Sequence, residues 1–207
     1  MLRSFGLFVL CSALTVASTT VTAQVDQKST WGFAAARIDS RFSHSIYTGY
    51  GYRALFLIGG LVTNPRTGYT EQVLGTGARL RSKRSLGQLA ALTFCNASDS
   101  RYAQLYYFPT LTLRRVSISA PFEAYLPLDS AGVRQFAMPG LAVLSHVGGQ
   151  FAAGLVYELG AAERARTTQA GGVAFRLALP GAELGVDAFG GLSHRRSHVR
   201  LVFRAFY

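Results

Sequence analysis

Val199-Arg200-Leu201-Val202-Phe203-Arg204-Ala205-Phe206-Tyr207 is the stretch of sequence that decides the fold. Successive side chains of a β-strand point to opposite faces, so residues two apart share a face. One face carries the apolar residues Val199, Leu201, Phe203, Ala205 and Tyr207. The other face, extended back by one residue, carries His198, Arg200 and Arg204. The pattern predicts a strand with one apolar and one charged face.

Apolar residues stand at every second position back from Tyr207, an aromatic residue at the end of the sequence. This pattern resembles the C-terminal signature by which small Gram-negative outer-membrane β-barrels are recognised for assembly. The resemblance implies that Val199, Leu201, Phe203, Ala205 and Tyr207 form the assembly signature, and that the C-terminus lies on the periplasmic side. It also implies two partners: the barrel-assembly machinery during biogenesis, and the lipids of the outer membrane.

The start of the chain has the features of an export signal. Met1-Leu2-Arg3-Ser4 precedes an apolar run over residues 5–17, and Val21-Thr22-Ala23 offers a small-x-small cleavage site. The run is 13 residues long, whereas a membrane-spanning helix needs roughly 20. We therefore expect residues 1–23 to be a cleaved signal peptide and residues 24–207 to form one transmembrane β-barrel domain. Only Cys95 would remain after cleavage, so an internal disulfide is excluded.

The composition favours a barrel over a helical membrane protein. Charged residues make up only 15% of the chain and aromatic residues 12%, whereas soluble domains carry about a quarter charged residues. The longest apolar run after the signal, residues 54–62, is nine residues, too short for a spanning helix. A closed barrel is the other way to satisfy every backbone group in a membrane.

The alternation seen at the C-terminus recurs in segments of about ten residues, the length that crosses a bilayer when tilted. Turn-rich stretches separate these segments. The strands predicted are 31–38, 45–52, 53–63, 69–82, 87–96, 101–113, 116–126, 134–145, 150–160, 169–179, 183–192 and 197–207. A change of parity predicts a two-residue hairpin at Arg114-Arg115. The division near Tyr52-Arg53 is weaker, and 45–63 could be one strand. The fold class is thus an all-β, up-and-down antiparallel barrel, with ten to twelve strands favoured and eight left open.

Ionisable residues gather on the face opposite the apolar stripe, which predicts a network of charges in the lumen. Its predicted members are Glu71, Arg79, Arg81, Glu123, Glu158, Arg176, Glu183, Asp187, Arg200 and Arg204. We favour an interior filled with paired charges, since small barrels are packed inside. The alternative is a narrow channel that favours anions, because arginine rings exclude cations. The net charge of +11 could also indicate nucleic-acid binding, but the signal and the barrel pattern argue against it.

No motif for catalysis, metal or cofactor binding is found. The four histidines are His44, His146, His194 and His198, and the densest cluster lies at 192–198. Adjacent Ser and His on a strand point to opposite faces, so the neighbouring Ser–His doublets are not dyads. We expect a non-enzymatic outer-membrane barrel with a structural, adhesive or narrow-pore role. One alternative is a lipid-modifying or hydrolytic enzyme using the His194–His198 region. The other is a soluble exported barrel with its apolar residues turned inward.

Overall fold

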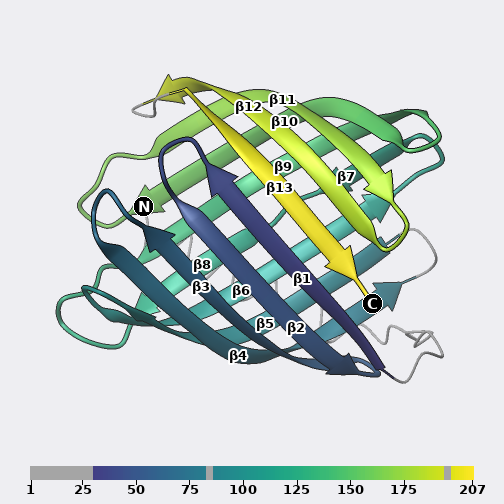
Figure 1. Cartoon of the computed structure of the whole chain (residues 1–207). Helices are drawn as coiled ribbons and strands as arrows, with labels where there is room; N and C mark the ends of the chain where they lie inside the picture. Colours follow the sequence, from purple (N-terminus) through teal and green to yellow (C-terminus); the bar gives the residue numbers. More distant parts are fainter. Residues whose placement is uncertain (1–29, 83–85, 194–196) are drawn as a thin grey trace.

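The chain forms one antiparallel sheet in which strands follow one another in sequence order (Figure 1). The computed structural model describes residues 30–82, 86–193 and 197–207, and thirteen strands lie within these ranges. They are β1 (Thr30–Asp39), β2 (His44–Tyr52), β3 (Leu55–Asn64), β4 (Tyr69–Ser82), β5 (Leu86–Ala97), β6 (Arg101–Thr112), β7 (Val116–Ser119), β8 (Phe122–Pro127), β9 (Gln135–Gly148), β10 (Phe151–Ala162), β11 (Thr168–Leu179), β12 (Ala182–Ser193) and β13 (His198–Phe206). The described residues include no helix long and apolar enough to cross a membrane.

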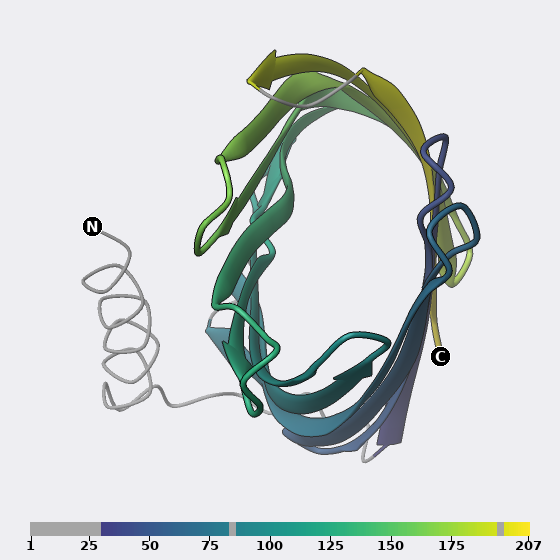
Figure 2. The same cartoon turned by 90° about the vertical axis from the view of Figure 1, so that its left-hand side faces the viewer.

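The first and last strands close the sheet into a barrel, as Figure 2 shows. β1 pairs with β13 from Phe33 opposite Phe206 to Asp39 opposite Arg200. Beyond this ladder, Gly32 N donates to Tyr207 O at 2.7 Å, and Tyr207 N donates back to Gly32 O at 3.1 Å. Closure leaves no open sheet edge, so the wall satisfies its backbone groups internally, as a hydrocarbon environment requires.

Two short strands share one position in the wall. Both β7 and β8 pair with β6 on one side and with β9 on the other, so the thirteen strands occupy twelve positions. The chain leaves the ladder at Ala120-Pro121, opposite Phe108 and Pro109 of β6. Proline has no N–H to donate. Ala120 N still donates to Pro109 O at 3.1 Å, but neither Pro109 nor Pro121 can donate a bond, and the ladder is interrupted between Ser119 and Phe122. The prediction of one continuous strand over 116–126 was wrong in this detail, whereas the all-β antiparallel barrel is confirmed.

The weaker division near Tyr52-Arg53 and the predicted hairpin at Arg114-Arg115 are both turns in the structure. Tyr52 pairs with Leu55, and Arg53 between them has a positive φ of 53°. At the second turn, Leu113 N donates to Val116 O at 2.7 Å, which leaves Arg114-Arg115 as the loop. The single strand over 45–63 is therefore excluded, and each of the twelve predicted segments occupies one barrel position.

Apolar side chains face outward and charged ones face the lumen. In β13, Val199 is 44% exposed and Leu201 50%, whereas Arg200 between them is 7% exposed. The same alternation continues in β12, where Leu184 is exposed and Asp187 is buried. This facing is the one predicted for a membrane barrel, and it is the reverse of the facing that a soluble ligand-binding barrel requires.

Some glycines are needed because neighbouring strands approach too closely for a side chain. A Cβ on Gly172 of β11 would collide with the backbone carbonyl of Ala188 in β12. A Cβ on Gly154 of β10 would meet the carbonyl of Val143 in the same way. Because backbone cannot move aside as a side chain can, these positions fix the spacing between strands.

We expect Gly172→Ala to lower the free energy of unfolding by about 1–3 kcal/mol, the usual cost of overpacking. Gly59→Ala is the matched control, because a Cβ there has only Val73 O within 4 Å, at 3.8 Å; its effect should stay within about 0.5 kcal/mol. Urea titration in detergent micelles, followed by circular dichroism, measures both. Equal stability of the two variants would show that the strand spacing adjusts freely.

Candidate functional site

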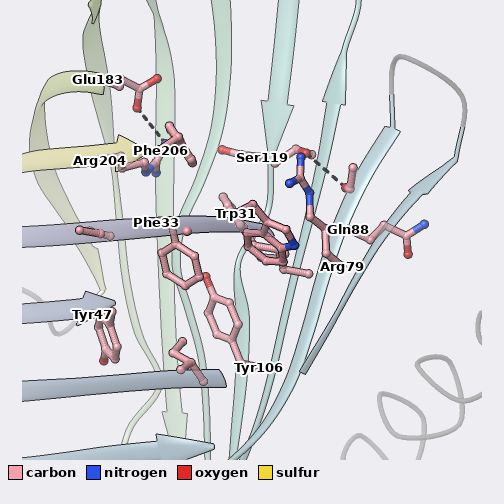
Figure 3. Close-up of a pocket in the computed structure, with 18 of the residues that line it drawn as sticks. Trp31, Phe33, Tyr47, Arg79, Gln88, Tyr106, Ser119, Glu183, Arg204 and Phe206 are labelled. Carbon is pink, nitrogen blue, oxygen red and sulfur yellow. Dashed lines mark hydrogen bonds and ion pairs between the residues drawn. The ribbon is translucent and has the colours of Figure 1, made fainter. Parts of the chain in front are cut away.

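The lumen contains a cavity of about 710 Å³. It lies towards the rim where β1 begins and β13 ends, since Trp31 and Phe206 line it (Figure 3). Tyr207 and the β2–β3 turn residue Arg53 line it as well. Residues from β1 to β9, β12 and β13 complete its surface. We call this rim the C-terminal rim. The predicted fully packed interior is therefore not observed in this half of the barrel.

One side of the cavity is lined by Trp31, Phe33 and Tyr47, and Phe56 packs against the first two of these rings. We call these four residues the aromatic wall. Each of these residues pairs directly with a glycine on the next strand: Trp31 with Gly51, Phe33 with Gly49, Tyr47 with Gly60 and Phe56 with Gly77. A Cβ on Gly51 would lie 2.5 Å from Cε2 of Trp31, so the indole occupies the space that a side chain would need. Aromatic rings that cover glycines across strands stabilise sheets. The rings consequently lie against the barrel wall.

The aromatic wall is packed in a defined geometry. The rings of Trp31 and Phe33 are 6.4 Å apart between centroids and inclined by 20°. The ring centroid of Phe56 lies 5.5 Å from that of Trp31 and 6.2 Å from that of Phe33, in the tilted and edge-on arrangements that aromatic pairs prefer. Trp31 Nε1 also donates a hydrogen bond to Arg53 O at 2.8 Å. The indole is therefore held at both its face and its polar edge.

A second side of the lumen is polar and lies on β5 to β8. Thr93 Oγ1 donates to Gln104 Oε1 at 2.7 Å, and Gln104 Nε2 donates to the Tyr125 hydroxyl at 2.9 Å. Tyr125 in turn donates to Glu123 Oε2 at 2.8 Å. Glu71 of β4 receives a similar bond from the Tyr69 hydroxyl, also at 2.8 Å. The two carboxylates are thus held by tyrosines, and neither forms an ion pair with any side chain that the structure describes.

A cluster of charges lies near the opposite rim, and we call it the outer charge cluster. Its members are Asp39, Arg41, Glu158, His198 and Arg200. Glu158 is only 1% exposed; Arg200 Nη2 lies 2.5 Å from its Oε2, and His198 Nε2 lies 3.1 Å from its Oε1. Arg41, from the β1–β2 turn, binds Asp39 at 2.6 Å. Burial makes Asp39, Glu158, His198 and Arg200 depend on one another, because water cannot replace a lost partner there; Arg41 is 30% exposed.

Ion pairs also link the last three strands. Arg176 Nη1 of β11 lies 2.5 Å from Asp187 Oδ1 of β12. Arg204 Nη1 of β13 lies 2.9 Å from Glu183 Oε1 of β12. Arg176 Nε is 3.7 Å from the same Glu183 oxygen. The pairs connect adjacent strands along the wall instead of crossing the lumen.

The structure brings together six of the ten residues predicted for the lumen network: Glu158, Arg176, Glu183, Asp187, Arg200 and Arg204. Glu71 and Glu123 lie on the polar side instead. Arg79 stacks on Trp31, with Cζ 4.9 Å from the ring centroid. The side chain of Arg81 lies outside what the structure describes.

Sequence reasoning missed Asp39, Arg41 and Arg37. Arg37 and Asp39 share a strand face with Phe33, so the period of two could have placed both in the lumen. His198 was assigned to the charged face of its strand but not to the network. Its imidazole is stacked on Phe189 at 4.4 Å and has no exposed surface, a poor position for a catalytic base. His194 lies outside the described residues, and those that are described contain no group of His, Cys, Asp or Glu suited to a metal ion.

The cavity has more cationic than anionic groups. Its described lining includes Arg37, Arg53, Arg79 and Arg204, against the carboxylates of Glu123 and Glu183. Arg204 is neutralised by Glu183. Arg37, Arg53 and Arg79 form no ion pair with any described carboxylate, so their charges act on the cavity.

Comparison with known proteins supports the fold. No protein-family model and no curated protein matches the chain. Among solved structures, the KdgM porin matches with a TM-score of 0.58 at 8% identity, over 84% of this chain and 98% of the porin. The chain shares its fold, a closed antiparallel β-barrel, with this porin. The KdgM porin in complex with disordered oligogalacturonate matches with a TM-score of 0.57 at 8% identity, over the same shares of both chains. The NanC porin matches with 0.54 at 8% identity, over 85% of this chain and 99% of the porin.

We expect Glu158→Gln to lower the free energy of unfolding by about 3–5 kcal/mol, because buried Arg200 loses its nearest carboxylate and keeps only Asp39, at 3.9 Å. Glu163→Gln is the control, since Glu163 pairs with Arg134 at 3.8 Å and the two side chains are 37% and 55% exposed; its cost should be about 0–1 kcal/mol. The urea concentration at the unfolding midpoint, measured in micelles, compares the stability of the two variants. A small effect at Glu158 would mean that the cluster contributes little to stability.

Outside the barrel wall, Asp129 ties the β8–β9 loop to the start of β6. Its carboxylate accepts hydrogen bonds from Ser100 Oγ at 2.5 Å, Arg101 N at 2.8 Å and Gly132 N at 3.1 Å. These bonds, that of Ser100 first, lower the pKa of Asp129 below its usual value. Because the pKa is lowered, the hydrogen bonds to the Asp129 carboxylate are fully formed above the usual pKa of aspartate. They are lost as the pH falls through the pKa of Asp129 in the folded protein.

We therefore expect amide hydrogen exchange at Arg101 and Gly132, corrected for its intrinsic pH dependence, to become faster on acidification. Asp129→Asn should exchange rapidly at every pH, while Asp99→Asn, changed at a neighbouring loop position, should behave like the unchanged protein. Persistence of the pH dependence in Asp129→Asn would assign it to another group.

Proposed function

We propose that the chain is a narrow outer-membrane channel that favours small anionic solutes. The observation that carries this proposal is the surplus of arginines on the cavity, where Arg37, Arg53 and Arg79 have no described carboxylate partner. Cationic groups lining a pore attract anions and repel cations. Localisation in a Gram-negative outer membrane, after cleavage of residues 1–23, is part of the same proposal.

The distribution of packing favours a pore over a purely structural or adhesive role. Near the outer charge cluster the lumen side chains are buried and ion-paired, as a stabilising interior would be. Towards the C-terminal rim the lumen is hollow, with a cavity of about 710 Å³. A barrel that served only as a scaffold would have no need of this space, since small barrels fill their interiors with side chains.

The structural neighbours support the same class of solute. The KdgM porin has been observed with oligogalacturonate, which is anionic by its chemistry. We extend only the charge of that ligand to this chain. The exposed apolar residues of β13, including Val199 and Leu201, support the proposed contact with lipid and with the assembly machinery.

The test is the ion selectivity of the folded protein in planar bilayers under a salt gradient. We expect the reversal potential to indicate a preference for chloride over potassium. Arg37→Glu and Arg79→Glu should each shift it towards cations, because each replaces a positive charge on the cavity by a negative one.

Arg134→Glu is the matched control, since Arg134 is 55% exposed at the opposite rim and does not line the cavity. It should leave the reversal potential close to that of the unchanged protein. Absence of conductance steps in protein that shows heat-modifiable gel mobility would contradict the channel, and cation preference would contradict its proposed selectivity.

A further inference from the structure

We infer that the aromatic wall and the arginines beside it form a binding site for the ring of an anionic sugar. The inference rests on the proposed function, because the ligand would be one of the anions that the channel admits. It goes further, since attraction by charge requires no aromatic surface. Three features of the cavity support it: a flat apolar surface, unpaired guanidinium groups next to that surface, and hydroxyl and amide groups elsewhere on the lining (Figure 3).

The apolar surface has the size and flatness that a sugar ring requires. Trp31 and Phe33 lie side by side at 6.4 Å with an inclination of only 20°. Arg79 lies over the Trp31 ring, so Phe33 is the ring of this pair that is left to face a sugar. Gly51 and Gly49 behind them allow the rings to lie against the wall. One face of a pyranose consists of C–H groups, and such a face packs favourably on the negative face of an aromatic ring.

Two unpaired guanidinium groups lie on either side of this surface. Arg79 stacks on Trp31 at 4.9 Å, and a guanidinium stacked in this way keeps its N–H donors in its own plane, where a carboxylate can bind. Arg37 follows Phe33 by four residues on the same strand face, which places their Cα atoms about 13 Å apart. Ala35, the residue between them on that face, is small and also lines the cavity. The strand therefore offers a recess between an aromatic ring and a cation.

The rest of the lining matches a ligand rich in hydroxyl groups. Polar side chains from β5 to β7 line the same cavity. Thr93, Gln104 and Thr110 already hydrogen-bond within the wall, which leaves the Gln88 amide nitrogen and the hydroxyls of Thr112, Ser117 and Ser119 for a ligand. A binding site for an inorganic anion would need the arginines alone. A site for an aromatic carboxylate would use the aromatic wall and the arginines, but not these hydroxyl and amide groups. The combination favours a sugar acid.

The protein contains its own probe, because Trp31 is the only tryptophan in the chain. We would titrate folded full-length protein in micelles with digalacturonate and follow tryptophan emission, with isothermal calorimetry as a second readout. We expect saturable binding of digalacturonate, at least about tenfold weaker binding of the neutral sugar galactose, and weaker binding of benzoate, because each of these lacks one class of contact.

Arg79→Gln and Phe33→Leu should each weaken digalacturonate binding by about tenfold, through loss of a charged donor and of a stacking surface. Phe94→Leu is the matched control, since Phe94 is 47% exposed and does not line the cavity; it should bind as the unchanged protein does. Circular dichroism and heat-modifiable mobility establish that each variant is folded.

The outcomes separate this inference from the proposed function. Anion selectivity in bilayers without digalacturonate binding would overturn the sugar site and leave the channel. Loss of affinity in Arg79→Gln but not in Phe33→Leu would also overturn it, because binding would then be electrostatic only. Benzoate binding as tight as that of digalacturonate would assign the site to aromatic carboxylates. A cation-selective pore would overturn both proposals.

Discussion

Closure of the backbone ladder between β1 and β13 is the constraint on which the rest of the structure depends. A sheet of this kind exposes a row of unpaired N–H and C=O groups if it stays open, and such an edge is not tolerated in hydrocarbon. The pairing from Phe33 opposite Phe206 to Asp39 opposite Arg200 removes the edge. Once the sheet is closed, alternate side chains must point into a confined lumen, so the sequence of every strand is divided between lipid-facing and lumen-facing residues.

The side chains of the lumen form two groups, one near each rim of the barrel. Near one rim, Glu158, His198 and Arg200 form a buried cluster that binds the last strand to β10, over the two strands between them. Near the other rim, aromatic rings lie on glycines and arginines keep their charge available to the cavity. Stability and access to the lumen are therefore separated along the barrel axis. The same face of β13 serves both, since Arg200 belongs to the cluster and Arg204 to the cavity.

Much of the fold can be predicted because its main signal is local. Alternation with a period of two is clear in strands such as β12 and β13, and a change of parity marks the turn at Arg114-Arg115, whereas the turn near Tyr52-Arg53 has a weaker signal. The break at Ala120-Pro121 was not predicted, because it depends on Pro109 lying opposite in the next strand, which only the register shows. The ion pairs were predicted as a set, but not individually. Asp187 lies opposite Arg200 in the ladder yet binds Arg176, while Arg200 binds Glu158. Such choices depend on side-chain reach across a curved wall, which a sequence pattern does not contain.

The glycines beneath the aromatic wall also limit how much the width of the lumen fluctuates. A side chain that projects into a lumen can change rotamer and so alter the free cross-section on the nanosecond timescale. A ring lying on Gly51 or Gly49 has little such freedom, because the backbone supports it on one side and neighbouring rings flank it. The width on this side is then set by the rigid sheet. A lumen whose width is set by backbone keeps a nearly constant width during thermal motion. It would therefore separate solutes by size at a nearly fixed limit.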